Sequence, residues 1–353
     1  MRHGVYYWKC DCPRPEHERT TGFTAAKYDG AGIEAEVSEA CRAVLGSTPE
    51  IVTPLRCAGD HYAYRVEHSG RTLLFRAAAD ATGDDYMLAE AALTALAAQA
   101  GVPVPRILHT AAEPGAQLRW QLMEFVAGST LRDVPLEGTA IASDLGRLLR
   151  RLHRVPIDGF GFIDTGHLRA TGQVRGLDRR YADYVTCRLD DHIAYVTRHG
   201  LLGADQAAQV RGLFTRQAAR FALEAAVLVH RDPALWNLIG DASRITALVD
   251  WDDAVGGDPA DDLSILRCLH DAAYTAAVES AYWDGSIPPD GFEARVRLHT
   301  LRNMLWKAQI RHQLGYFKPG AAAFLAGLDR GRTLEQTTRT KLHEALACCL
   351  EIA

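Results

Sequence analysis

Residues 227–263 read VLVHRDPALWNLIGDASRITALVDWDDAVGGDPADDL, and this stretch decides the fold. It contains three short apolar runs, and Gly-Asp-Ala-Ser at 240–243 reads as a turn between the second and third. Those two runs predict a hairpin. The hairpin would return Asp250 to the neighbourhood of Asn237 and Asp232, so three oxygen-bearing side chains should converge.

This grouping suits phosphoryl transfer from a magnesium nucleotide. Mg²⁺ prefers oxygen ligands, and the protein supplies one or two of them while phosphates complete the shell; Asn237 and Asp250 fit that role. A carboxylate free of metal can orient an attacking hydroxyl and take its proton, which is the predicted role of Asp232. The structural alternative is that His230 and Asp232 only hydrogen-bond in a buried loop, while the acidic cluster caps a helix that starts near Ala260.

His230-Arg231-Asp232, four residues and Asn237 are similar to the catalytic loop of the protein-kinase-like fold. With Val249-Asp250-Trp251 and the Gly-Asp-Pro-Ala-Asp-Asp-Leu run at 257–263, the chain more closely resembles the aminoglycoside phosphotransferase family. That family has H-x-D-x-x-x-x-N, I/V-D-W/F and G-D-P-x-x-D-L. The resemblance implies a bilobal α+β protein-kinase-like fold, with an antiparallel five-stranded N-terminal lobe and a mainly helical C-terminal lobe.

The order of patterns along the chain predicts the same division. Strands are expected at 51–55, 62–66, 72–77, 104–109 and 118–126, and helices at 33–45, 86–99, 140–153, 178–199, 205–224, 262–283, 292–316 and 334–350. Strands first and helices after them indicate an α+β arrangement with a cleft at the junction. We therefore predict an N-terminal arm of unknown role at 1–30, a nucleotide-binding lobe at 31–126 and a helical lobe with the catalytic loop and acceptor site at 127–353.

The resemblance also implies the nucleotide half of the site. Gly59 is expected in the loop that covers the phosphates, and Glu90 is expected to pair with a cation on the third strand. The family usually has lysine there, whereas this chain has Arg76 and no lysine between Lys27 and Lys307. Arginine is longer, planar and always charged, so the replacement is not conservative.

The segment Met-Glu-Phe-Val at 123–126 matches the hinge, where main-chain groups of Glu124 and Val126 would bind the base. The resemblance implies ATP or GTP, with Mg²⁺, as the cofactor, and main-chain contacts leave too little trace in a sequence to decide between the two nucleotides. A protein kinase is not expected, because Asp250-Trp251-Asp252 lacks the glycine of the kinase triplet and leaves no room for a peptide-binding segment.

By resemblance, the acceptor is expected to be a small-molecule hydroxyl. Three aspartates of 250–262 are assigned neither to the metal nor to the start of a helix: Asp252, Asp253 and Asp261. They would give the pocket mouth a negative field that attracts a cationic acceptor such as an aminosugar. The alternative is a solvated acidic loop. His153, His270 and His299 lie in helical patterns and are expected to be packing residues without a catalytic role.

These predictions favour an ATP-dependent or GTP-dependent O-phosphotransferase acting on an antibiotic or related specialised metabolite, of aminoglycoside or nucleoside type, for resistance or self-protection. Two alternatives remain open. One is a nucleotide-binding pseudokinase, suggested by the missing lysine. The other is a primary-metabolite kinase for choline, homoserine or a ketosamine, which would share every motif.

Composition limits the partners. A net charge of -5 over 353 residues argues against a nucleic acid, and no apolar stretch reaches the roughly 20 residues that span a bilayer. The first residues have no apolar core typical of a signal peptide, so a cytoplasmic location and eight free cysteines are expected. Cys10 and Cys12 lack a second ligand pair for zinc. Monomer and homodimer both remain open.

Overall fold

A computed structural model describes residues 32–55, 61–78, 86–113, 118–136, 138–313, 315–318 and 331–352. The expected N-terminal arm, with Cys10 and Cys12, and the expected phosphate loop, with Gly59, lie outside the described residues.

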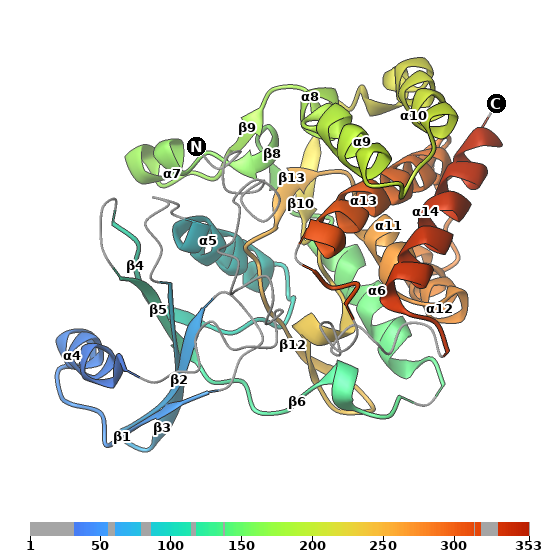
Figure 1. Cartoon of the computed structure of the whole chain (residues 1–353). Coiled ribbons are helices and arrows are strands. Elements are labelled where there is room, and N and C mark those ends of the chain that lie inside the picture. The colour runs from blue at the N-terminus through green and yellow to red at the C-terminus, as the bar shows by residue number, and fades with distance from the viewer. Residues whose placement is uncertain are drawn as a thin grey trace.

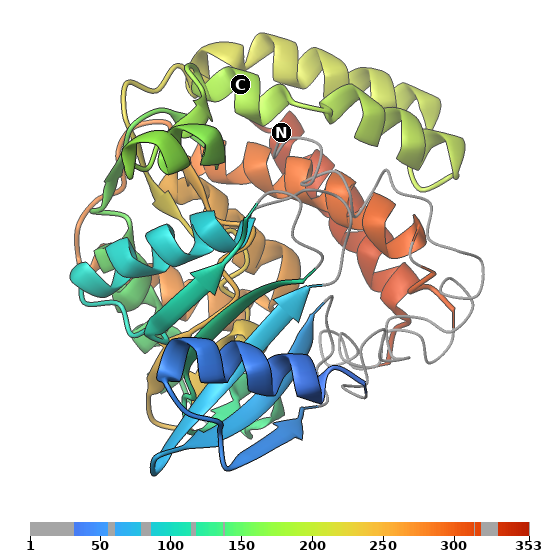
Figure 2. The same ribbon diagram turned by 90° about the vertical axis from the view of Figure 1, so that its left-hand side faces the viewer.

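The N-terminal lobe is an antiparallel five-stranded sheet in the order β1-β2-β3-β5-β4, as predicted (Figure 1). Its strands are β1 (Ile51–Pro54), β2 (Tyr62–His68), β3 (Arg71–Ala78), β4 (Ile107–Ala111) and β5 (Arg119–Glu124). Successive side chains of a strand point to opposite faces. On β3, Leu73 and Phe75 enter a core beneath helix α4 (Glu34–Leu45), which lies across the strands in Figure 2, whereas Leu74 and Arg76 line a cavity on the other face.

Helix α5 (Tyr86–Gln99) packs on the cavity side of this sheet, where the side chain of Gln121 on β5 donates to the carbonyl of Met87 at 2.9 Å. This contact matters because α5 carries Glu90, and the same face of β3 carries Arg76. The sheet and α5 therefore bring the two residues of the expected ion pair to one side of the lobe.

After the hinge the chain is mostly helical (Figure 1). The helices are α6 (Ala140–Leu152), α7 (Thr165–Thr171), α8 (Tyr181–Thr186), α9 (Leu189–Arg198), α10 (Ala204–Arg216), α11 (Pro259–Leu269), α12 (Ala272–Trp283), α13 (Phe292–Gln313) and α14 (Leu334–Leu350), with 3-10 turns η1 (Leu131–Asp133), η2 (Ala218–Phe221) and η3 (Leu235–Asn237). The main core lies among these helices. The predicted α+β architecture is thus confirmed.

Two small sheets hold the motif segments. One has the order β7-β10-β13-β8-β9, and the other β12-β11-β6. Their strands are β6 (Ser129–Thr130), β7 (Pro156–Ile157), β8 (Phe160–Ile163), β9 (Gly176–Asp178), β10 (Ala226–Val229), β11 (Leu238–Gly240), β12 (Ile245–Leu248) and β13 (Val255–Gly257). Antiparallel β11 and β12 form the predicted hairpin, although 235–237 is a 3-10 turn rather than strand.

Three predicted helices are shorter or divided. The helix expected at 178–199 breaks at Arg188, whose φ of 59° is left-handed, and becomes α8 and α9. The helix expected at 262–283 breaks at Asp271, because its carboxylate caps α12 by accepting from the N–H of Tyr274 at 2.8 Å. The helix expected at 205–224 ends at Arg216 and continues as η2.

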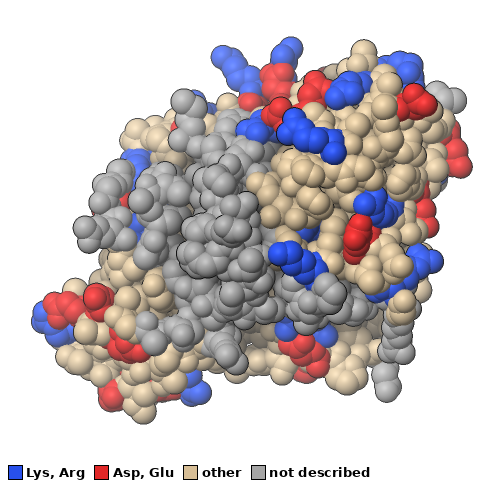
Figure 3. Space-filling view, in the orientation of Figure 1, with Lys and Arg blue, Asp and Glu red and all other residues tan. Residues whose placement is uncertain are grey.

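On the face drawn in Figure 3, acidic and basic side chains of the described residues are interspersed. In the part of the chain that the structure describes, no helix is both long and apolar enough to cross a membrane.

Candidate active site

A cavity of about 490 Å³ lies between the sheet lobe and the catalytic hairpin. Its size is that of a typical small-molecule site. The walls come from β3 and α5, from the hinge and from the motif segment; they include Arg76, Glu90, Glu124, Val126, Asn237 and Asp250.

The catalytic loop fixes the carboxylate of Asp232. Its Oδ2 accepts hydrogen bonds from Trp236 Nε1 and Asn237 Nδ2, each at 2.9 Å. The same Nδ2 also donates to the main-chain oxygen of Asp232 at 2.9 Å. Asp232 Oδ1 is buried and accepts no hydrogen bond from the described residues. One carboxylate oxygen is therefore held in place, while the other has no hydrogen-bond partner among the described residues.

The hairpin then brings Asp250 back to Asn237. The N–H of Val249 donates to the carbonyl of Asn237 at 2.9 Å, and Asp250 follows in a left-handed conformation with φ of 68°. Such a conformation in a residue other than glycine is strained and persists where the surroundings impose it. The amide nitrogen of Asn237 is used by Asp232, so its side-chain oxygen is the atom that could bind a metal, and Asn237 and Asp250 both line the cavity. Two oxygen donors of this kind fit Mg²⁺, which takes its other ligands from phosphates and water.

Asp262 supports this loop, a role that the sequence did not predict. The carboxylate is fully buried and accepts from the N–H of His230 at 3.0 Å and the N–H of Arg231 at 2.6 Å. His153 Nε2 lies 3.0 Å from the same carboxylate, and its Nδ1 lies 3.0 Å from the hydroxyl of Tyr282. His153 is thus a buried packing residue, as expected, but it also connects the loop to α12. The cap of α11 is Asp258, which accepts from the N–H of Ala260 at 3.1 Å.

Arg231, next to Asp232, is anchored in the helical lobe. Its backbone is left-handed, with φ of 69°, and its guanidinium lies 3.3 Å from Asp261 and 3.4 Å from the side-chain oxygen of Asn303. Asp261 also lies 3.6 Å from Arg302 and is fully buried. Burial by itself would raise the pKa of Asp261, but Arg231 and the other neighbouring cations hold it well below its usual value.

The prediction that Asp261 adds to a negative field at the pocket mouth is therefore wrong. A carboxylate with no exposed surface, paired with two guanidinium groups, does not project such a field. Asp252 and Asp253 are partly exposed, and for them the negative field stays a prediction.

Arg76 joins the two lobes. Its Nη1 donates to Glu90 Oε1 at 2.7 Å, and its Nη2 lies 3.4 Å from Asp250 Oδ1 and 3.3 Å from the ring of His61. Burial opposes the charge of Arg76, but Glu90 and Asp250 together raise its pKa above the usual value. The N–H of Trp251 also donates to Glu90 Oε1, at 3.3 Å. The guanidinium is therefore fixed at the end of the cavity where the expected metal ligand lies.

The hinge residues Glu124 and Val126 line the cavity. The side chain of Glu124 is 44% exposed and pairs with Arg106 at 3.0 Å. The N–H of Glu124 bonds to the carbonyl of Arg106, and that of Phe125 to the carbonyl of Thr72. These bonds hold the strand end in place and leave the main chain around Val126 along the cavity wall.

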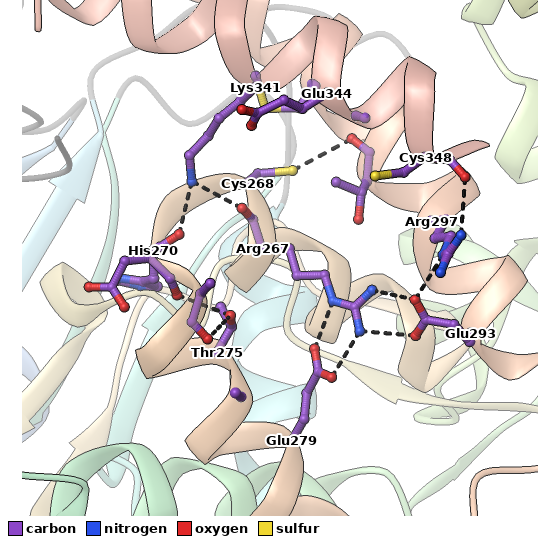
Figure 4. Close-up of a pocket in the computed structure, with 16 residues that line it drawn as sticks. Arg267, Cys268, His270, Thr275, Glu279, Glu293, Arg297, Lys341, Glu344 and Cys348 are labelled. Atoms are coloured by element: carbon purple, nitrogen blue, oxygen red, sulfur yellow. Dashed lines mark hydrogen bonds and ion pairs between the residues drawn. The ribbon is translucent and has the colours of Figure 1, made fainter. Parts of the chain in front are cut away.

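A second cavity, of about 560 Å³, lies between α11, α12, α13 and α14 (Figure 4). Its central cation, Arg267, is already paired with Glu279 and Glu293 through contacts of 2.8–3.0 Å. The lining of this second cavity contains none of the motif residues that converge at Asp232. The smaller cavity is therefore the candidate active site.

Residues 52–298 match the model of the phosphotransferase enzyme family, APH. The chain belongs to this family. Similar solved structures include aminoglycoside phosphotransferase APH(4)-Ia, with 18% identity, a TM-score of 0.65, and coverage of 89% of this chain and 98% of the other. A putative fructosamine-3-kinase from Thermobifida fusca YX-ER1 has 20% identity, a TM-score of 0.58 and coverage of 87% and 98%. Spectinomycin phosphotransferase APH(9)-Ia has 12% identity, a TM-score of 0.54 and coverage of 90% and 97%.

At these identities the solved structures establish the fold alone. The family match makes the protein a phosphotransferase of the APH family, and it leaves the acceptor open between antibiotic and fructosamine types.

Proposed function

We propose that this protein transfers the γ-phosphoryl group of ATP, or of GTP, to a hydroxyl group of a small-molecule antibiotic or related specialised metabolite. The observation that carries the proposal is the arrangement of three motif residues. Asp232 is hydrogen-bonded to Asn237, and Asn237 and Asp250 line a cavity that also contains Arg76. Similar structures support it: a variant of APH(4)-Ia was solved with AMP-PNP and hygromycin B, and APH(9)-Ia with ADP and spectinomycin.

In this proposal Asp232 orients the acceptor hydroxyl and takes its proton at Oδ1, since Oδ2 is already bonded to Trp236 and Asn237. Asn237 and Asp250 would hold Mg²⁺, which supplies neutralising charge to the phosphates when it is bound. The Gly59 loop, Arg76 and Glu90 place the triphosphate, and the main chain of Glu124 and Val126 binds the base. Positioning and charge neutralisation provide most of the catalysis in such transfers.

The acceptor is a small molecule with a free hydroxyl, of aminoglycoside or nucleoside type. Asp252 and Asp253 favour an acceptor that carries positive charge. Transfer of this kind in the cytoplasm would inactivate the antibiotic and protect the cell. The similarity to a putative fructosamine-3-kinase supports a ketosamine as the second candidate acceptor.

The test is a nucleotide-consumption screen with aminoglycosides, nucleoside and peptide antibiotics, ketosamines and primary alcohols. With the acceptor that is consumed, Asp232→Asn should lower kcat at least about a hundredfold, because its amide places a donor where the hydroxyl proton must be accepted. Calorimetry should show unchanged Mg·ATP binding.

The matched control is Asp241→Asn, the same chemical change in the exposed turn of the same hairpin. It should leave kcat within a factor of two or so of the wild type, since such surface changes are small. A fully active Asp232→Asn variant would remove the assigned base. Mg·ATP binding without transfer to any member of the screen would favour the pseudokinase alternative.

A further inference from the structure

One face of helix α13 runs along the catalytic loop. Asn303 on this face accepts from Arg231 Nη2 at 3.4 Å and donates to Asp261 at 2.9 Å. Residues four apart in a helix lie on the same side, one turn further along. Lys307 therefore follows Asn303 on the side of α13 that faces the loop, one turn beyond the contact with Arg231.

The ring of Trp306 contacts both Lys307 and Arg231 of the catalytic loop. The guanidinium of Arg231 lies 5.6 Å from the ring centroid, and the ammonium of Lys307 lies 5.0 Å from it. Both cations contact one aromatic residue, and Asp232 directly follows Arg231 in the chain. Lys307 thus lies near the catalytic loop on the side of the helical lobe, whereas Arg76 belongs to the sheet lobe.

Lys307 is mostly buried, yet no described carboxylate lies within ion-pair distance of its ammonium. Burial lowers the pKa of Lys307. The carboxylates of Asp232 and Asp253 raise this pKa, and the positive charge of Arg311 on the same helix lowers it further. The remaining titratable neighbour is the thiol of Cys268 on α11. A buried cation without a paired anion is unfavourable. Its presence indicates a negatively charged ligand that arrives from outside the chain.

The catalytic loop supplies no cation of its own between Asp232 and Asn237. Residues 233–236, between the base and the metal ligand, are Pro-Ala-Leu-Trp and carry no charge. During phosphoryl transfer negative charge is spread over three oxygens of the moving group. Arg76 is held by Glu90 and Asp250 on the nucleotide side. On the helical-lobe side of the catalytic loop, Lys307 is a described cation with no carboxylate within ion-pair distance.

We propose that the ammonium of Lys307 binds an oxygen of the phosphoryl group while that group passes to the acceptor, which makes Lys307 a catalytic residue opposite Arg76. The acceptor oxygen forms a bond to the γ-phosphorus as the bond to the bridging oxygen of the leaving nucleoside diphosphate breaks. The acceptor proton goes to Asp232, and Lys307 keeps its protons and neutralises charge only. The inference rests on the proposed function and adds a residue to it.

The test uses Mg·ATP with water as the acceptor, so it needs no knowledge of the natural substrate. Lys307→Met keeps length and apolar contacts and removes the charge. Hydrolysis of ATP should fall about a hundredfold, as for the loss of one donor to a developing oxyanion, while calorimetry shows unchanged Mg·ATP binding. Lys307→Arg should recover part of the rate, because the positive charge remains.

Unfolding temperature separates this role from a structural one. Removing an unpaired buried charge should leave the Tm of Lys307→Met equal to or above that of the wild type. The matched control is Lys341→Met on α14. Figure 4 shows Lys341 directed at the end of α11, where its ammonium donates to the carbonyls of Arg267 at 3.1 Å and His270 at 2.9 Å. This control should lower Tm and leave hydrolysis unchanged.

Wild-type hydrolysis rates in Lys307→Met would overturn the inference. So would normal hydrolysis combined with a raised KM for an acceptor, since Lys307 would then bind an anion of the acceptor. A wild-type protein that neither hydrolyses ATP nor transfers its phosphate would refute the proposed function, and the role of Lys307 with it. An active wild type with an equally active Lys307→Met variant would refute the role of Lys307 alone.

Discussion

The carboxylate of Asp262 should hold the catalytic loop in its active shape, and Asp262→Asn tests this. In the structure one oxygen accepts from the N–H of Arg231, and the other accepts from the N–H of His230 and contacts His153 Nε2. Asparagine keeps one acceptor and replaces the other with an NH₂ group. At least one buried main-chain N–H, that of His230 or Arg231, then faces a donor and loses its partner.

The expected loss of stability follows from these contacts. A buried donor left without an acceptor costs about 1–3 kcal/mol, and the surviving hydrogen bond weakens because its acceptor is no longer charged. Together these effects predict a decrease of about 2–4 kcal/mol in the free energy of unfolding. Tm should fall by about 5 °C or more. Because the donors belong to the residues just before Asp232, ATP hydrolysis should fall about tenfold, as expected when a catalytic group is displaced by a fraction of an ångström.

The assays are thermal unfolding and steady-state hydrolysis of Mg·ATP, with Asp258→Asn as the control. Asp258 caps the same helix and pairs with Arg295 at 2.6 Å, but it bonds to no N–H of the catalytic loop. The control should therefore lower Tm with little change in the rate per folded molecule. Wild-type Tm and rate in Asp262→Asn would refute the reasoning, as would equal loss of rate in both variants.

Three further predictions concern other parts of the molecule. Arg76→Lys should weaken Mg·ATP binding about tenfold in calorimetry, because a point charge cannot span Glu90 and Asp250 as the guanidinium does. Gly128→Ala should lower Tm, since Gly128 has φ of 140° and an added Cβ would lie 2.9 Å from Ile239 Cγ2; unchanged Tm would contradict this. Burial lowers the pKa of His192, His270 and His299 to about 4, so the unfolded state binds more protons than the folded state between pH 6.5 and 4. Stability in urea should fall as pH decreases through that window, and a flat profile would count against their burial.

The sequence predicted those parts of the fold that local patterns determine. The alternating residues of β2 and β3 and the turn before Ile245 define a sheet and a hairpin, and both are present. Helix breaks were missed where a single residue ends a periodic pattern. Arg188 does so by adopting a left-handed backbone, and Asp271 does so by capping the next helix.

The site was predictable wherever one motif contains both partners, as for Asp232 and Asn237, which are five residues apart. Contacts between distant segments were not. No local pattern shows that Asp262 accepts from residues 31 and 32 positions earlier, or that Asp250 lies beside Arg76. Asp261 was misplaced for the same reason, since its counterions Arg231 and Arg302 come from separate segments.

The contact between Arg76 and Asp250 has a consequence for the order in which ligands arrive. A divalent ion that approached Asp250 by itself would meet a fixed positive charge 3.4 Å from the carboxylate and would be repelled. An ion that already carries a triphosphate brings anions that attract the guanidinium and turn the same charge into an attraction. If Asp250 holds the metal as proposed, this geometry would favour entry of metal and nucleotide as a single complex over loading of the bare ion.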